Sequence, residues 1–152
     1  MTRAKKFGVG VLAAFIAIQF FRPARNQSNA LLPTDIARTV AVPQDVAVIL
    51  KAACHDCHSN NTVYPWYANV QPSAWYLANH VAEGKRELNF SEFGSYSKRK
   101  QANKLKAIAR EVEKGAMPLS SYKLMHPSAR LSSGQKTQII SWAAAAQDSL
   151  RQ

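Results

Sequence analysis

The stretch Cys54-His55-Asp56-Cys57-His58 contains both cysteines of this 152-residue chain. Two thiols three positions apart can reach the two vinyl groups of one porphyrin, and the histidine that follows then lies under the iron as an axial ligand. An apolar stripe at helical spacing runs from Val46 to Ala53, so we expect the motif at the end of a helix. The pattern predicts one covalently attached haem c, with thioethers at Cys54 and Cys57 and with His58 as the proximal iron ligand.

Two other sites could use the same cysteines. Zinc could take Cys54 and Cys57 together with two of the four histidines, which are His55, His58, His80 and His126. The second ligand pair, however, lacks the close spacing of a zinc module. A thioredoxin-like redox pair needs a preceding strand and a βαβ frame, which this helical sequence does not offer. Both alternatives are less favoured than haem.

The predicted sixth iron ligand is Met117. It lies just beyond an expected helix end, where Pro118 stiffens a loop that can present the thioether from the opposite face of the haem. The main alternative is His80, and His126 and Met125 are further candidates. The sixth ligand therefore remains open among these side chains, with Met117 first.

The N-terminal residues 1–25 are expected to be a signal anchor or a signal peptide. Three basic residues precede an apolar run over 7–21, which stops at Arg22. As a helix, the run would be about 22 Å long, short of the roughly 30 Å hydrocarbon core of a bilayer. No small-x-small cleavage site follows directly, which favours an uncleaved single-pass anchor. Residues 26–41 are expected to be a tether, and 42–152 the folded domain.

The fold class predicted for the chain is all-α, because no segment alternates with period two for the length of a strand. Helical patterns cover about 43–53, 73–83 with a stop at Gly84, 97–114, and 132–150, where Ser132-x-x-Gln135 matches a capping box. We expect about four helices with long loops, preceded by the anchor helix. Trp66, Trp75 and Trp142 are expected in the core and the walls of the haem pocket.

The formal net charge is +11, and nine basic residues lie between positions 85 and 114. Four glutamates oppose them there, so the simplest interpretation is a solvated helix face. Such a face could also recognise an acidic redox partner. Nothing indicates nucleic-acid binding, because no aromatic residues interleave with the cations and no nucleic-acid motif is present.

The chain resembles the small bacterial "haem-binding domain" family of exported proteins with one C-x-x-C-H. The resemblance rests on these motifs in order: Cys54-His-Asp-Cys-His-Ser-Asn60, Tyr64-Pro-Trp-Tyr67, Gly84-Lys-Arg-Glu-Leu-Asn-Phe-Ser91, Gly115-Ala-Met-Pro-Leu-Ser-Ser-Tyr122, His126-Pro127 and Trp142. It implies a cytochrome-c-like helical fold with covalent haem. Since c-type maturation occurs on the outer side of the bacterial inner membrane, it also implies a periplasmic domain.

The leading functional hypothesis is a membrane-tethered monohaem one-electron carrier, in which His58 and Met117 saturate the iron. The alternative is a peroxidase or gas sensor with an open or labile sixth position. A third hypothesis, a haem-delivery module without turnover, fits poorly with covalent attachment.

Overall fold

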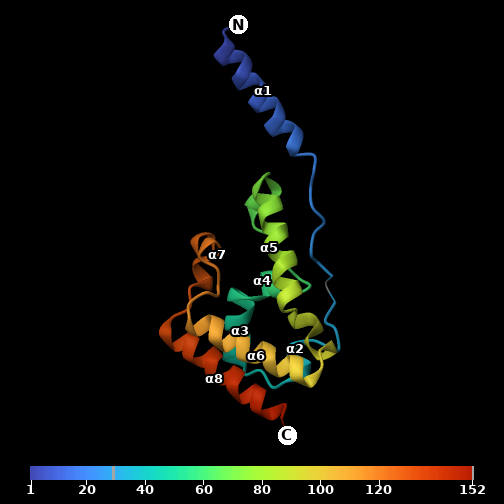
Figure 1. Cartoon of the computed structure of the whole chain (residues 1–152), viewed down its shortest axis with the longest axis vertical. Coiled ribbons are helices and arrows are strands. Elements are labelled where there is room, and N and C mark those ends of the chain that lie inside the picture. Colours follow the sequence, from blue (N-terminus) through green and yellow to red (C-terminus); the bar gives the residue numbers. More distant parts are fainter. Residues whose placement is uncertain (29, 152) are drawn as a thin grey trace.

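The computed structural model describes residues 1–28 and 30–151, and within them the regular elements are all helices (Figure 1). An isolated bridge between Gln27 and Asn61 is the sole β-type pairing among these residues. The all-α prediction is confirmed. The elements are α1 (Arg3–Ile18), α2 (Ile36–Thr39), α3 (Gln44–Ala53), α4 (His55–His58), η1 (Trp66–Asn69), α5 (Ser73–Glu87), η2 (Phe90–Ser95), α6 (Lys98–Glu113), α7 (Ser120–Met125), η3 (Pro127–Ala129) and α8 (Ser133–Ser149).

Helix α3 forms where the apolar spacing predicted it. All four residues of the stripe, Val46, Ile49, Leu50 and Ala53, are buried. Asp45 lies in the first turn, where its charge favours the positive end of the helix dipole. The helix therefore delivers its C-terminal end, and with it Cys54, to a fixed place against the core.

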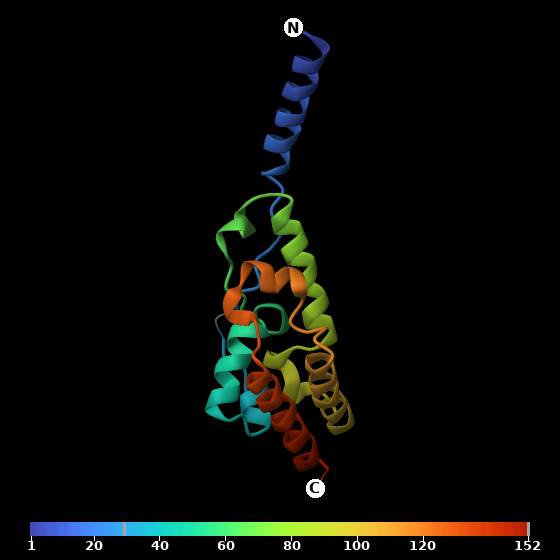
Figure 2. The same cartoon turned by 90° about the vertical axis from the view of Figure 1, so that its left-hand side faces the viewer.

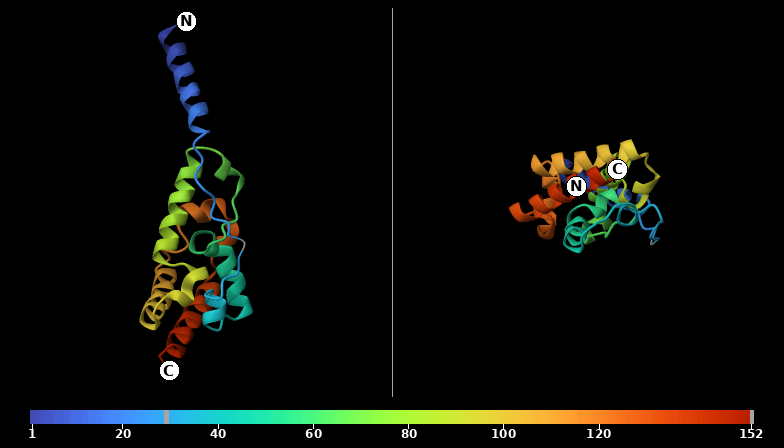
Figure 3. Two further views of the ribbon diagram at one scale, coloured as in Figure 1. Left: turned by 90° about the vertical axis from the view of Figure 1, so that its right-hand side faces the viewer. Right: turned by 90° about the horizontal axis from the view of Figure 1, so that it is seen from below.

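Helices α6 and α8 pack side by side at the end of the molecule farthest from α1 (Figures 1 and 3). Ser97 caps α6, and Gly115 ends it with a φ of 70°, a left-handed conformation that glycine adopts without strain. The capping box of Ser132 and Gln135 begins α8, as predicted. The main core lies between these helices, α3 and η2, and includes Leu50, Phe90, Phe93, Leu105, Trp142, Ala143 and Ala146.

Parts of residues 26–41, expected to be a tether, pack against the domain: residues 26–28 lie beside the loop after the motif, and residues 35–40 lie against the core. Ile36 and Val40 are buried in the main core, and Asp35 caps α2 through the Ala37 amide. Asn26 binds the loop after the C-x-x-C-H motif, because its side-chain amide donates to the Ser59 carbonyl and to Thr62 Oγ1. The packed part of the chain thus begins well before Val42, through contacts distant in sequence that local patterns do not reveal.

The expectation for the three tryptophans holds for one of them. Trp142 is 6% exposed and donates its indole N–H to the Ala41 carbonyl. Trp66 is 74% exposed and Trp75 is 40% exposed, so the prediction that they form core and pocket walls is wrong. Both lie at the end of the domain nearest α1, on η1 and at the start of α5 (Figures 1 and 2).

Helix α1 projects from the domain and buries none of its residues (Figure 2). It coincides with most of the predicted anchor, although it is only 16 residues long. Among the described residues, no helix has the length and apolarity required of a bilayer-crossing segment. The structure therefore does not confirm a single-pass anchor.

Candidate functional site

The C-x-x-C-H motif forms a single helical turn directly after α3. Cys54 ends α3 and precedes α4, and its carbonyl accepts hydrogen bonds from the amides of Cys57 (3.3 Å) and His58 (3.0 Å). Both thiols and the imidazole are therefore held by backbone geometry on one short turn. This is the placement that the sequence predicted for the motif.

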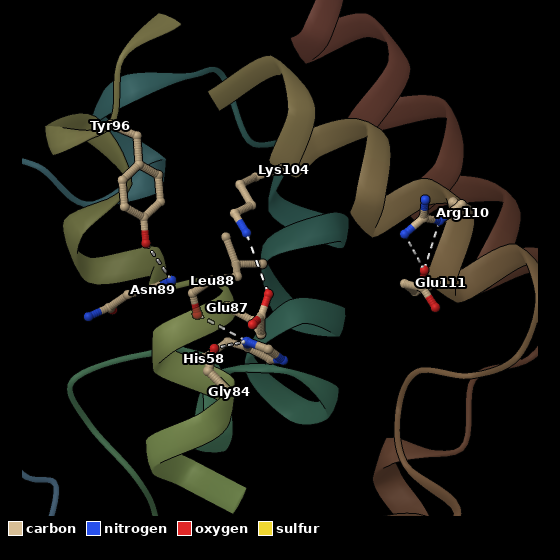
Figure 4. Close-up of polar contacts among 9 residues, drawn as sticks. All are labelled: His58, Gly84, Glu87, Leu88, Asn89, Tyr96, Lys104, Arg110 and Glu111. Atoms are coloured by element: carbon tan, nitrogen blue, oxygen red, sulfur yellow. Dashed lines mark hydrogen bonds and ion pairs between the residues drawn. The ribbon is translucent and has the colours of Figure 1, made fainter. Parts of the chain in front are cut away.

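The orientation of His58 is fixed by two backbone carbonyls. Its Nδ1 lies 2.9 Å from the Gly84 oxygen and 3.0 Å from the Leu88 oxygen, at the end of α5 (Figure 4). Because a carbonyl only accepts hydrogen bonds, Nδ1 must carry the proton and donate. In the neutral imidazole, the lone pair then resides on Nε2, which is the arrangement of a metal-ligating histidine.

Gly84 allows this approach of α5 to the motif. A β-carbon at position 84 would lie 2.5 Å from the Cys57 carbonyl oxygen and 3.1 Å from its carbonyl carbon. The prediction that Gly84 stops the helix is wrong, since α5 continues to Glu87. The glycine is in the helix because a larger residue would push α5 away from Cys57, and with it the carbonyls that hold His58.

A cavity of about 290 Å³ opens beside the motif. Cys54, Cys57 and His58 line it from the turn of the motif, and Met117 and Tyr122 line it from the chain between α6 and η3. A second cavity of about 300 Å³ shares Cys54, His58 and Met117 with the first and extends to α6. A third, of about 300 Å³, shares Cys57 and Tyr122 with the first. The motif thus borders three adjoining, mostly apolar spaces.

The structure brings Met117 to the same cavities as His58. After the turn at Gly115, the Met117 amide donates to the Glu111 carbonyl (3.1 Å), which holds the loop against the end of α6. Met117 is half-buried, and the adjacent Pro118 is buried. The two predicted iron ligands, His58 and Met117, therefore come from different segments of the chain and line the same cavities. The assignment of Met117 as a ligand stays a prediction.

The three alternative ligands differ in whether they line these cavities. His80 also lines the first cavity, with its Nδ1 2.9 Å from the Tyr76 carbonyl oxygen. His126 lines none of these three cavities. Its Nδ1 lies 3.1 Å from the Tyr122 carbonyl oxygen, and its ring stacks on the Tyr122 ring with 4.0 Å between the ring centres. Met125 is half-exposed and borders only the third cavity. His80 is therefore the strongest rival of Met117.

Sequence reasoning missed an anchor of the motif, the hydrogen bond from the Tyr122 hydroxyl to Asp56 Oδ2 (2.6 Å). The other carboxylate oxygen of Asp56 accepts from the Val63 amide (3.0 Å). Burial and the hydrogen bond to Asp56 raise the pKa of Tyr122 above its ordinary value. The only local signal was the tyrosine in Gly115-Ala-Met-Pro-Leu-Ser-Ser-Tyr122, and nothing in sequence linked it to Asp56.

Burial raises the pKa of both thiols of the motif. The cysteines are free, and burial raises the pKa of Cys54 to about 12 and that of Cys57 to about 11. Reactive redox cysteines have depressed pKa values, so this environment disfavours a thioredoxin-like pair. The helix before Cys54 likewise replaces the strand that such a site requires.

The zinc alternative needs a ligand set that the structure does not assemble. In the part of the chain that is described, no three His, Cys, Asp or Glu side chains are grouped to hold a metal ion. A structural zinc site uses four such ligands. The donor set beside the cavity, two thiols and one oriented imidazole on a single turn, instead fits a haem attached through thioethers.

Cationic side chains border the second cavity on the α6 side. Lys104 and Arg110 line it, and each pairs with a glutamate: Lys104 Nζ lies 3.8 Å from Glu87 Oε2, and Arg110 Nη2 lies 2.7 Å from Glu111 Oε1 (Figure 4). Lys104 and Arg110 are the cationic side chains that line this cavity, and an anionic group of a ligand bound there could pair with them.

Comparison with known proteins supports the cofactor. No curated protein and no solved structure matches the sequence. The family model described as "Haem-binding domain" matches residues 13–145, which is most of the chain. The chain belongs to this haem-binding domain family.

Proposed function

We propose that the protein is a monohaem c-type cytochrome that carries one electron at a time. The observation that carries the proposal is the orientation of His58, whose Nδ1 donates to the Gly84 and Leu88 carbonyls beside a cavity that both thiols also line. Such an imidazole is already in the tautomer and orientation that an axial ligand requires. The family membership supports haem as the ligand, and the motif supports its covalent attachment.

The attachment chemistry uses both cysteines as thiols. Cys54 and Cys57 would each hold the haem through a sulfur bonded to one vinyl carbon; the thiol proton would go to the other vinyl carbon, so the addition would need no oxidant. The two free cysteines on one turn can supply both thioethers of a single haem. We therefore propose one haem c per chain.

The bound haem supplies the one-electron chemistry, and the protein supplies ligands and environment. His58 would provide an imidazole nitrogen and Met117 a thioether sulfur to the iron, a pair that raises the reduction potential relative to two histidines. Pro118, Leu119 and Tyr122 line the same cavity and limit the access of water. If both residues bind the iron, no place would be left there for a substrate.

One observation favours a second candidate, a peroxidase or gas sensor with a labile sixth position. His80 lines the same cavity as Met117, so an imidazole lies near the space where a distal ligand or an acid-base group would act. In this case Met117 would be displaced or absent from the iron. Exogenous carbon monoxide would then bind the reduced protein without denaturation.

We further propose that the domain works in the periplasm, attached to the membrane through the N-terminal segment. Three basic residues lie in the first turn of α1, before its apolar run, and none of the residues of α1 is buried. This charge and hydropathy pattern is that of an export segment. The cationic residues of α6 would attract an acidic redox partner.

The proposal is tested on full-length protein produced with c-type maturation machinery. Haem should remain with the chain after denaturation and organic extraction, with a mass increase of one haem. The Cys54→Ser/Cys57→Ser double variant should lose it, whereas His126→Gln, a control outside the cavity, should retain it. Haem that is extracted from the wild type would refute covalent attachment.

A further inference from the structure

The end of the domain nearest α1 presents large apolar and aromatic side chains to solvent. Trp66 on η1 is 74% exposed, and Trp75 and Tyr76 in the first turn of α5 are 40% and 57% exposed. Phe20 and Phe21, directly after α1, are also exposed. We call these five residues the aromatic end of the domain. Most exposed apolar residues of a folded protein occur singly, so this gathering next to an apolar helix calls for an explanation.

Hydrogen bonds fasten the C-terminal end of α1 to this part of the domain. The Gln71 amide donates to Gln19 Oε1 (2.9 Å), and the Gln71 side chain donates to the Phe21 carbonyl (2.7 Å). The Trp75 indole donates to the same carbonyl (2.8 Å). Gln71 is fully buried, so these hydrogen bonds at the junction are shielded from water. The C-terminal end of α1 therefore lies next to η1 and the start of α5, which carry the aromatic end (Figures 1 and 2).

The charge in this region has one sign. Residues 1–34 and 57–82, which build α1, the junction, η1 and most of α5, contain no aspartate or glutamate. Arg22 and Arg25 follow α1; Arg25 donates to Asn69 Oδ1 (2.6 Å) and lies 4.9 Å from the ring centre of Tyr64. Tryptophan and tyrosine beside arginine are the residues enriched where a protein crosses from lipid to water.

We propose that the aromatic end rests on a lipid surface, with Trp66, Trp75 and Tyr76 among the headgroups and α1 in the apolar layer. The proposal rests on the membrane attachment in the proposed function and adds which face of the domain contacts the membrane. Phe7 and Ile16 are both exposed, and their spacing places them on opposite sides of α1. A protein partner would cover one side of the helix, whereas lipid would surround it, so a lipid occupant is favoured.

This contact would set the height of the cofactor site above the membrane. Gly84, which holds His58, is eleven residues beyond the start of α5 at Ser73, about 16 Å along the helix axis. Because α5 runs from the aromatic end toward α6, the cationic helix α6 lies at the far end of the domain (Figures 1 and 3). The basic residues of α6 would therefore face a partner from solution rather than the lipid.

The test is hydroxyl-radical footprinting of the full, haem-loaded chain, free and bound to vesicles of phosphatidylcholine and phosphatidylglycerol. The proposal expects oxidation of Trp66, Trp75 and Tyr76 to fall at least about threefold on vesicles. Val48, which is 59% exposed on α3, is the internal control and should not change. Trp66→Ser should lower the vesicle partition coefficient about tenfold, and Val48→Ser should leave it unchanged.

The possible results distinguish membrane attachment of the chain from contact of the aromatic end with lipid. If the chain floats with the vesicles while the three aromatic residues keep their free reactivity, membrane attachment stands and the contact of the aromatic end is refuted. If the chain does not float with vesicles, both are refuted. Protection that appears without vesicles and rises with protein concentration would identify a second copy of the chain as the occupant and would also refute the lipid contact.

Discussion

Gly84 and Cys57 approach each other so closely that a β-carbon on Gly84 would lie 2.5 Å from the Cys57 carbonyl oxygen. The same glycine offers its own carbonyl oxygen to His58 Nδ1 at 2.9 Å. One residue of α5 thus both permits contact with the C-x-x-C-H turn and orients its histidine.

Gly84→Ala should destabilise the haem-loaded protein by roughly 1–3 kcal/mol, although alanine is the better helix former. The added methyl group meets backbone rather than a flexible side chain, so α5 or α4 must shift. Chemical denaturation of the holoprotein measures the loss. Gly134→Ala, in α8, is the matched control: the nearest atom to its added carbon is 3.9 Å away, so no loss is expected there. Equal stability of the two variants would contradict the packing described for α5.

Tyr122→Phe should cost about 1.5–3 kcal/mol, because it removes a 2.6 Å hydrogen bond to the Asp56 carboxylate, which remains partly buried. The control is Tyr76→Phe, in which the ring is retained and the side chain is 57% exposed; a change within about 0.5 kcal/mol is expected. Urea unfolding followed by haem absorbance measures both. The prediction fails if the Tyr122 variant is as stable as the Tyr76 variant.

The stability of the wild type should fall at alkaline pH, in part through Tyr122. Burial and the Asp56 hydrogen bond raise the pKa of this phenol above its value in the unfolded chain. A group with a raised folded pKa stabilises the protein below its unfolded pKa, about 10 for tyrosine, and this stabilisation is lost as the pH rises further. Unfolding free energies measured from about pH 8 to about pH 11 should therefore decline less steeply in Tyr122→Phe. Identical slopes would exclude Tyr122 as a contributor.

Lys104→Gln should lower the reduction potential, on the order of 30 mV, about half of the 59 mV that a tenfold change in a one-electron equilibrium represents. Lys104 lines the cavity beside His58, and a nearby positive charge favours the reduced state of the iron. Spectroelectrochemical titration gives the potential directly. Lys106→Gln removes the same charge from an exposed position on the same helix and should shift the potential less. A larger shift in the control would place the cofactor elsewhere.

The features that sequence predicted well are those fixed by nearby residues. The stripe from Val46 to Ala53, the capping box at Ser132 and the end of α6 at Gly115 all depend on spacing within a few residues, and the structure has each of them. The family membership follows from motifs of the same local kind.

What sequence did not reveal depends on contacts between distant segments. Gly84 has the signature of a helix end, and only the position of Cys57 shows why it lies inside α5. Ile36 and Val40 are buried in the main core, and α2 packs against η2, a contact between distant segments that no local periodicity reveals. Trp66 was expected to be buried because it is large and aromatic, which is a tendency of the residue type and does not fix its place.

The most direct test of the central claim is the visible spectrum of the full-length holoprotein, oxidised and reduced, compared with Met117→Ala and with Met125→Ala as the matched control. The account predicts a six-coordinate haem in the wild type, with the weak charge-transfer band of methionine-ligated ferric iron. That band should disappear in Met117→Ala, persist in Met125→Ala, and carbon monoxide should bind only the Met117 variant readily. A wild type that lacks the band and binds carbon monoxide would contradict the electron-carrier account and favour a sensor or peroxidase.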